Sequence, residues 1–450
     1  MASGSPPQAP SQSVQGSSWR FILRALRSRN YRLFFGGQSI SLIGTWMTRI
    51  ATSWLVYRLT GSAMLLGVTG FAGQLPMFLL GPFAGVWVDR WDRQRTLIWT
   101  QVFSMVQSLL LAALALSGRI RISHIIALSV VQGIVNAFDT PARQAFVSEM
   151  IDDRADLPNA IALNSSMVNA ARLIGPSIAG VLIAKVGEGY CFLSDGISYI
   201  AVIISLLVMQ VSRRAAATGV RSVRRELIEG WQYVSGFAPI RSILLLLAVI
   251  SLVGMSYTVL MPIYASNVLH GGAHTLGFLM AASGCGALAG ALVLAARNTV
   301  RGMLKILPIA AIGFGVGLTV LSQTRTEWIA LGLMFIVGYS MMQHMAVSNT
   351  ILQTISDEDK RGRVMSYYTM AFLGMAPFGS LFAGAIAARI GVPRTFTFSG
   401  LFCVCFGAVF FTRMPGIRRL MRPIYQKLGI VPEIASGIGT ASTLRSPSEE

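Results

Sequence analysis

The chain has 450 residues, of which 53% are hydrophobic and only 12% charged, and it carries a formal net charge of +19. A charged share of about half the usual value excludes an ordinary water-soluble protein, because so much apolar surface must face lipid or other helices. The basic residues flank apolar segments and form no single patch, so the charge indicates membrane orientation and argues against nucleic-acid binding.

Two short segments precede the apolar part of the chain. Residues 1–18 are rich in Ser, Gln, Pro and Gly, and this composition predicts a disordered tail. Residues 19–27 combine basic and apolar side chains in a pattern typical of a helix lying on a membrane surface. The tail is too polar for the core of a cleaved signal, so no such signal is expected.

Twelve apolar stretches follow, each long enough to cross a bilayer core as a helix of roughly 20 residues. They form two sets of six, at 19–211 and 241–413, with a basic linker at 212–240 and a tail at 414–450. The sequence therefore predicts an all-α membrane protein with twelve transmembrane helices in two six-helix bundles. The predicted spans are 33–57, 64–88, 96–117, 122–142, 161–185, 190–211, 241–264, 275–296, 303–322, 327–349, 364–388 and 393–412.

The basic residues are distributed unevenly between the two sides of the membrane. With the N-terminus inside, 28 of the 37 Lys and Arg lie on the inner side and seven on the outer side. Cytoplasmic loops are enriched in these residues, so both termini are expected in the cytoplasm. On that side the linker carries Leu227, Trp231 and Val234 at helical spacing, which predicts an amphipathic helix along the membrane surface.

The two sets of spans show a weak internal repeat. The segment 148–154 after the fourth span and the segment 353–361 after the tenth both combine acidic and basic residues. Pro176 and Pro377 then follow at similar distances, each among small residues. This correspondence indicates two halves of related topology.

The short turn after the second span contains Gly85, Asp89, Arg90 and Arg93. A carboxylate at a span end can bind the N-terminus of a helix from the other half, which is worth ~0.3–2 kcal/mol. We therefore predict a cytoplasmic latch, in which Asp89 holds the inner ends of the two halves together. Asp139 is expected to pair with Arg90 or Arg93 in the same latch. The alternative is a solvated loop.

Charged residues inside the spans are candidates for function, because such groups are costly in a membrane. Arg172 lies near the middle of the fifth span, and Arg49 and Asp195 lie at similar depths, so an Arg49–Asp195 pair is geometrically possible. His344 is the histidine that falls within a span. For Arg172, Arg49 and Asp195 the alternative is a structural bridge or a snorkelling side chain, and for His344 a hydrogen bond to a neighbouring helix.

Other residues are candidates for a central cavity or for helix packing. Aromatic side chains beside amides suit a bulky, partly apolar ligand. The cavity candidates are Gln38, Trp46, Gln74, Asn136, Tyr257, Gln343, Asn349 and Tyr367. Gly175, Pro176 and Gly180 form a small-residue motif that lets helices approach closely. The four cysteines have no matching histidines, and no nucleotide loop or catalytic motif occurs, so no metal, cofactor or enzymatic activity is expected.

The turn at 85–93 resembles the loop 2–3 signature of the major facilitator superfamily, although Asp92 and Gln94 depart from it. The segments Arg29–Ser41 and Asp139–Phe146 resemble the bacterial siderophore-exporter branch, which is similar to the enterobactin exporters. The Gly175–Gly180 motif resembles one found in antiporters of the superfamily. Gln132-Gly133 matches the end of a span-4 pattern, but Ser129 stands where proton-coupled relatives have an arginine.

This resemblance implies efflux of a small organic molecule, a siderophore or drug-like compound, from a bacterial cytoplasm by alternating access. Proton coupling is expected, although the residue at 129 also leaves open a facilitator or importer of a nutrient without it. A non-transporting scaffold or sensor is a third hypothesis. The expected partners are the lipid bilayer, a small-molecule substrate and protons, with no nucleic acid.

Overall fold

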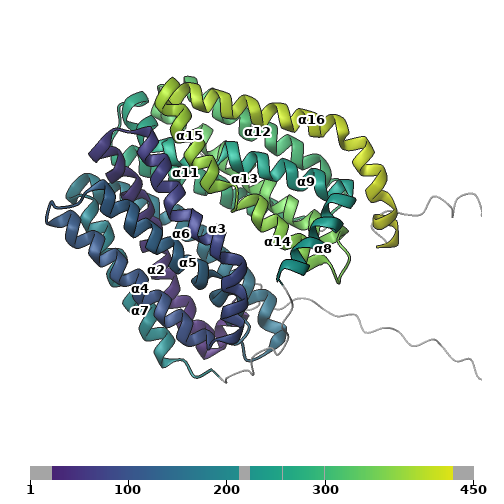
Figure 1. Ribbon diagram of the computed structural model, residues 1–450, viewed down its shortest axis with the longest axis horizontal. Coiled ribbons are helices and arrows are strands. Elements are labelled where there is room, and N and C mark those ends of the chain that lie inside the picture. The colour runs from purple at the N-terminus through teal and green to yellow at the C-terminus, as the bar shows by residue number, and fades with distance from the viewer. Residues whose placement is uncertain (1–22, 212–222, 256, 298, 429–450) are drawn as a thin grey trace, which may run out of the picture.

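The computed structural model describes residues 23–211, 223–255, 257–297 and 299–428, and all regular structure in these residues is helical. Figure 1 shows two bundles packed side by side, the first in purple to blue and the second in teal to yellow. The first comprises η1 (Arg24–Arg27), α2 (Arg29–Thr60), α3 (Ala63–Arg90), α4 (Arg93–Leu116), α5 (Ile122–Val147), η2 (Arg154–Asp156), α6 (Leu157–Val186) and α7 (Glu188–Val208). The second comprises α8 (Val223–Gly236), α9 (Ala238–Val249), η3 (Ile250–Gly254), α10 (Tyr257–Ile263), η4 (Tyr264–Val268), α11 (Ala273–Ala295), α12 (Met303–Gln323), α13 (Glu327–Ile355), α14 (Arg361–Phe372), α15 (Ala376–Ile390) and α16 (Val392–Lys427).

Eleven helical stretches of the described chain are long and apolar enough to cross a membrane. The twelfth span is α2, a helix of 32 residues that packs between α6 and α7. Its hydropathy is lower because it buries polar side chains such as Gln38 and Ser41 inside the first bundle. The predicted all-α membrane fold with twelve spans is confirmed.

The two halves repeat the same helix pairings. The third and sixth spans of the first half, α4 and α7, pack together, as do their counterparts α12 and α16 in the second half. The second and fourth spans, α3 and α5, pair in the same way as α11 and α13. The weak sequence repeat therefore corresponds to a structural pseudo-symmetry.

Local sequence explains where the first helices stop and start. Gly61 takes a left-handed conformation with φ of 60°, and its N–H donates to the Tyr57 carbonyl at 2.7 Å, which ends α2. The Ser62 hydroxyl then accepts from the Leu65 N–H and begins α3. Asp92 does the same for α4 by accepting from the Arg95 N–H at 3.0 Å. The unusual Asp92 of the turn is thus a helix cap.

The seventh and eleventh spans are interrupted helices, and not the continuous ones predicted at 241–264 and 364–388. A π-helical turn, η3, separates α9 from α10, and a short break before Pro377 separates α14 from α15. The two breaks lie against each other, because the Ser251 hydroxyl donates to the Phe372 carbonyl and Gly379 lies against the Leu252 backbone. Neighbouring side chains thus satisfy the carbonyl groups that the break exposes.

The linker helix α8 packs against α9 and α14 of the second half. The Tyr233 hydroxyl donates to the Asp357 carboxylate at 3.1 Å, and Lys360 lies 4.9 Å from the Tyr233 ring. Burial raises the pKa of Tyr233. Arg363 also pairs with Glu229 of α8 at 2.8 Å. The last helix of the second half, α16, continues past the predicted limit of 412 to Lys427.

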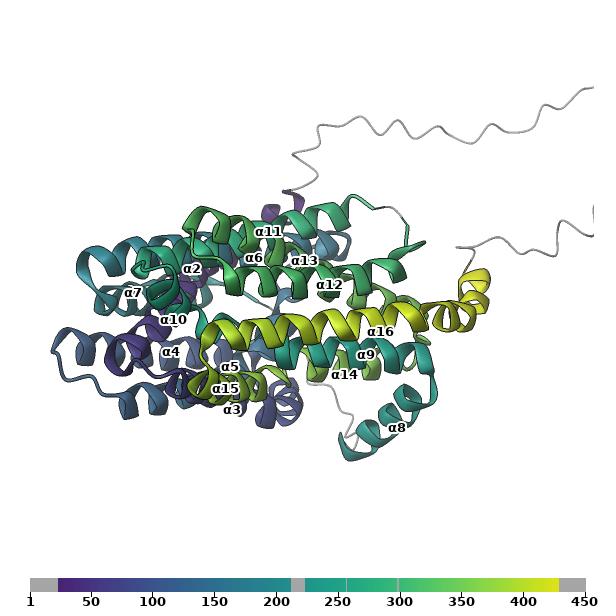
Figure 2. The same ribbon diagram turned by 90° about the horizontal axis from the view of Figure 1, so that it is seen from above.

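A seam joins the two halves at the end of the bundle away from the linker. In both views α3 lies beside α15 and α6 beside α11 (Figures 1 and 2). Glycines face each other at these contacts, Gly67 against Gly384 and Gly180 against Gly277. These pairs lie near the start of α3 and α11 and near the end of α6 and α15. We call this set of contacts the glycine seam.

Candidate functional site

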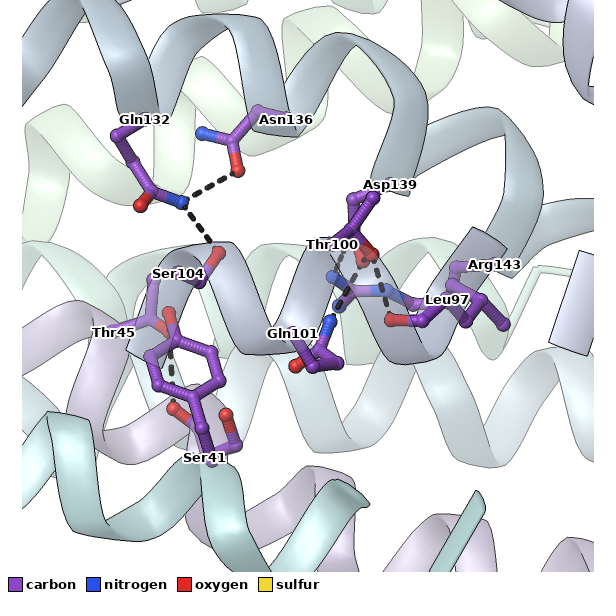
Figure 3. Close-up of polar contacts among 11 residues, drawn as sticks. Ser41, Thr45, Leu97, Thr100, Gln101, Ser104, Gln132, Asn136, Asp139 and Arg143 are labelled. Atoms are coloured by element: carbon purple, nitrogen blue, oxygen red, sulfur yellow. Dashed lines mark hydrogen bonds and ion pairs between the residues drawn. The ribbon is translucent and has the colours of Figure 1, made fainter. Parts of the chain in front are cut away.

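Asp139 of α5 is the centre of a buried polar cluster at the linker end of the first half (Figure 3). Thr100 and Gln101 of α4 donate to its Oδ1 at 2.9 and 2.7 Å, and Arg143 pairs with its Oδ2. The predicted pairing of Asp139 with Arg90 or Arg93 is therefore wrong. Arg143 lies one helical turn further on the same face of α5, so it reaches the carboxylate without crossing between helices.

The residues of the predicted latch lie on the surface of the first half. Asp89 is 58% exposed at its side chain and pairs with Arg93 at 3.1 Å, while Arg93 also pairs with Glu149 at 2.5 Å. Arg90 is exposed, and a Cβ placed on Gly85 would meet nothing within 4 Å. In this arrangement the latch residues bind within their own half, and a contact with the second half stays a prediction for a different state.

A strip of buried and half-buried polar side chains runs from this cluster through the first half. Figure 3 shows Gln132 donating to Ser104 and Asn136, at 3.2 and 3.1 Å. The hydroxyl oxygens of Thr45 on α2 and Tyr199 on α7 are 3.3 Å apart. The strip consists of side chains from α2, α4, α5 and α7.

Asp195 of α7 lies further along the strip, toward the seam end, and it is 1% exposed. The Ser108 hydroxyl donates to its Oδ2 at 2.7 Å, while its Oδ1 has no hydrogen-bond partner. Thr45 and Thr48 flank the carboxyl group. Asp195 forms no ion pair with any residue that the structure describes. A buried carboxyl group without a cationic partner is costly when ionised.

The predicted pair between Arg49 and Asp195 is wrong. Both residues have the expected depth, but Gly44 and Thr48 lie on the face of α2 that meets Asp195. Arg49 is about 100° further round the helix than Thr48. It therefore points away from α7 and leaves the carboxyl group to the hydroxyl groups around it.

Arg49 lies instead with Arg172 and Trp46, a group we call the arginine–tryptophan cluster. The guanidinium carbon of Arg49 is 4.8 Å from the centre of the Trp46 ring, and that of Arg172 is 5.8 Å from it. Both distances are within the range of a cation–π interaction. Gly175 allows this arrangement, because a Cβ there would clash with Trp46.

Two predicted cavity residues, Tyr257 and Gln343, and the candidate His344 are buried inside the second half. The Tyr257 hydroxyl bonds to Ser283 at 3.1 Å, and the Gln343 amide donates to the Gly290 carbonyl at 3.0 Å. His344 Nδ1 lies 3.3 Å from the Leu307 carbonyl oxygen, and the residue is fully buried. These three side chains tie helices together within the half, which for His344 is the alternative given above.

The remaining predicted residues bond within their own helix or pack against neighbouring helices. Gln74 donates to the Gly70 carbonyl of its own helix, Gln38 is buried, and Asn349 accepts from Gln353 at 2.6 Å. The Tyr367 ring lies 6.1 Å from the ring of Trp231 on the linker helix. Pro176 and Gly180 pack against Gly277, as part of the seam. The described residues contain no group of three potential metal ligands, and the four cysteines are unpaired.

Sequence reasoning missed three residues of these clusters. Arg143 follows Asp139 by four positions, and this spacing on one helix was a usable signal. Glu149 belongs to the acidic segment after the fourth span, but its pairing with Arg93 required the tertiary structure. Tyr199 follows Asp195 by four positions on an apolar helix, where it resembles an ordinary core residue.

Two pseudo-symmetric bundles of six spans, joined by a glycine seam and enclosing buried charges, define a membrane transporter of the major facilitator superfamily. Solved structures have the same fold. A bacterial homologue of the human lysosomal transporter Spinster, in an inward-facing and unoccupied conformation, has a TM-score of 0.69 at 13% identity. The match covers 91% of this chain and 99% of the homologue's chain. The nucleoside transporter NupG has a TM-score of 0.66 at 9% identity, over 86% of this chain and 99% of its own.

The chain belongs to the family described as transmembrane secretion effectors, which matches residues 22–420. It is similar to the staphyloferrin A transporter of Staphylococcus aureus, at 28% identity over 84% of this chain and 95% of the relative. It is also similar to the multidrug efflux pump Tap of Mycolicibacterium fortuitum, at 26% identity over 84% of this chain and 95% of that relative. Macrolide efflux protein A of Streptococcus pyogenes is 25% identical over 84% of this chain and 96% of that relative. The resemblance to this branch of the superfamily is confirmed.

Proposed function

We propose that this chain is a secondary active transporter that exports a small organic molecule, a siderophore or drug-like compound, by proton-coupled alternating access. The relatives transport or expel molecules of these kinds, as their names state. The observation that carries the mechanism is the one-sided contact between the halves. Contacts of the seam lie at one end, whereas Asp89 at the other end is exposed and bound within its own half.

The excess of Lys and Arg supports a cytoplasmic position for the linker and both termini. The seam then lies on the outer side, and the structure corresponds to the state open to the cytoplasm. The similarity to a structure in an inward-facing conformation is consistent with this orientation. The protein acts in the bacterial cytoplasmic membrane, with lipid, substrate and protons as its partners and without nucleic acid, cofactor or catalysis.

Asp195 is the best candidate for the proton-binding group. It is buried, lacks a cationic partner among the described residues, and has one oxygen without a hydrogen bond. Tyr199 and Cys191 of α7 are the titratable groups beside it, and α4 contributes the neutral Gln107 and Ser108. An exchange of protons at this carboxyl group would couple export to the pH gradient without an arginine at position 129.

We expect Asp195→Asn to abolish uphill transport while leaving exchange intact. In inside-out vesicles with an acidic lumen, the wild-type chain should concentrate substrate about tenfold for each pH unit, if one proton is exchanged per molecule. The variant should reach only the external concentration, because its side chain cannot release a proton, yet it should still catalyse substrate counterflow. Both are measured with a radiolabelled candidate compound.

Glu188→Gln is the matched control, because Glu188 lies on the same helix but pairs with Arg58 at 2.8 Å. It should retain uphill transport. Accumulation by Asp195→Asn at the wild-type level would remove Asp195 from the coupling mechanism. Wild-type transport that persists when the gradient is collapsed would favour a facilitator.

Asp89→Asn should slow turnover by about tenfold without unfolding the protein. The neutral side chain weakens the predicted latch in the outward-facing state, and substitutions at exposed positions usually change the free energy of unfolding by less than about 0.5 kcal/mol. Initial transport rates and the thermal unfolding midpoint measure the two effects. Glu358→Gln, at another exposed carboxylate near the linker, is the control. A normal rate for Asp89→Asn would contradict the latch.

A further inference from the structure

The arginine–tryptophan cluster places two positive charges near the middle of the membrane. Arg172 is at the midpoint of α6, whose 30 residues run from Leu157 to Val186. Arg49 is about two-thirds of the way along α2. Both guanidinium groups lie within 6 Å of the centre of one indole ring, that of Trp46. They are close enough for their charges to repel each other.

Neither arginine has an anionic partner among the residues that the structure describes. Neither makes an ion pair or a hydrogen bond with any residue that the structure describes. Arginines within membrane spans normally pair with a carboxylate or bind backbone carbonyl groups, because an unpaired charge is costly there. Two adjacent cations without such a partner therefore point to an anion that is absent from the protein itself.

The cluster faces the space between the two halves. Trp46 and Tyr57 are 11 residues apart on α2 and so lie on one face, and the Tyr57 hydroxyl donates to Asn267 of the second half at 2.6 Å. On α6 the backbone of Arg172 lies against Gly284 of α11, also in the second half. Arg49 is exposed despite its depth in the span. These contacts place the cluster just inside the closed seam.

A polar route leads to the cluster from the linker end. Ser165, Ser166 and Asn169 precede Arg172 on α6, and they bond only to carbonyl groups of their own helix. The two serines are exposed. Asn169 lies about one turn before Arg172, so a solute entering from this end passes these groups before it reaches the guanidinium groups.

We propose that Arg49, Arg172 and Trp46 form the substrate-binding site for an organic anion that carries a carboxylate beside an apolar or aromatic group. This inference rests on the proposed transport function and names its substrate class. The guanidinium groups donate paired hydrogen bonds to the carboxylate, for which their planar geometry is suited. The Trp46 ring provides the apolar surface on which the rest of the molecule lies.

The test compares two probes that share one ring system and differ in charge, 1-naphthylacetate and 1-naphthylacetamide. Their dissociation constants are measured on the full chain in lipid nanodiscs. We expect the acid to bind at least about tenfold tighter than the amide to the wild type, since hydrogen bonds between charged groups are about twice as strong as neutral ones. Arg49→Gln and Arg172→Gln should each reduce this preference, and the double variant should remove it.

Two further variants separate a binding role from a structural one. Arg49→Lys keeps the charge but not the paired donors, so it should restore part of the preference that Arg49→Gln loses. Arg325→Gln, at an exposed arginine between the ninth and tenth spans, should leave the preference unchanged. Each variant is first shown to keep the wild-type unfolding midpoint within a few degrees.

Equal binding of acid and amide to the wild type, binding of neither, or a preference that survives in the double variant would overturn the assignment. Its failure is distinguishable from failure of the transport proposal. Export without a charge preference contradicts only the site. Acid binding that depends on both arginines, in a protein that moves no solute in vesicles, contradicts only the transport function.

Discussion

Oxidation of a Gly70→Cys/Ser380→Cys variant is expected to abolish transport, and a reducing agent should restore it. A Cβ built on Gly70 of α3 lies 3.2 Å from the Cβ of Ser380 on α15. The usual separation in a disulfide is about 3.8 Å, so a small shift suffices. A bond at this point fixes the two halves together at the glycine seam, and alternating access requires that the seam opens. Transport in vesicles with oxidant, and then with reductant, measures the effect.

The chain offers a matched control within the first half. A Cβ on Gly73 of α3 lies 3.7 Å from the Cβ of Ser129 on α5, so Gly73→Cys/Ser129→Cys should also form a disulfide. This bond joins two helices that move together, and transport should persist. The exposed Cys285 and Cys405 are replaced by serine in both backgrounds. Full transport by the oxidised Gly70–Ser380 pair would show that the seam stays closed during turnover.

Asp139→Ala should produce the largest loss of stability of any single change in the polar clusters, about 3–5 kcal/mol. The substitution leaves Arg143 without its partner and removes the acceptor for the Thr100 and Gln101 donors. Thermal unfolding of the purified protein in one detergent measures the change. Asp152→Ala, at an exposed carboxylate on the same side, is the control and should lie within about 0.5 kcal/mol of the wild type.

A double-mutant cycle separates the ion pair from general damage to the cluster. Asp139→Ala and Arg143→Ala each leave one buried charge unpaired, whereas the double variant leaves neither. The double variant should therefore be more stable than the sum of the single losses implies, by about 1–3 kcal/mol. Additive losses would mean that the two residues do not interact in the folded protein.

Sequence alone predicted the span count, the two halves and the class of protein, because the hydropathy of a membrane span is a strong local signal. It identified Asp195, Arg49 and Arg172 as unusual for the same reason, since a charge in an apolar segment needs an explanation. What it could not supply was the direction in which each side chain points. Arg49 and Asp195 lie at similar depths but face different neighbours, so the partners were decided by helix rotation.

Tyr257 illustrates how that rotation is lost. Its aromatic side chain and its span, and not a helical phase, made it a cavity candidate. The π-helical turn at Ile250–Gly254 carries an extra residue, which turns every later side chain by about 100° relative to a regular α-helix. Tyr257 then faces Ser283 in the second half. The residues around Gly254 form no sequence pattern that predicts a π-helical turn.

The glycine seam has a consequence for how the transport cycle responds to conditions. Its facing groups at Gly67, Gly384, Gly180 and Gly277 are backbone atoms in van der Waals contact, and the Tyr57–Asn267 hydrogen bond beside them joins two uncharged side chains. Dispersion contacts and neutral hydrogen bonds are little affected by ionic strength or acidity. The contact between the halves at the glycine seam therefore contains no ion pair among the described residues. Added salt and acid should alter turnover only through titratable groups outside these glycine contacts.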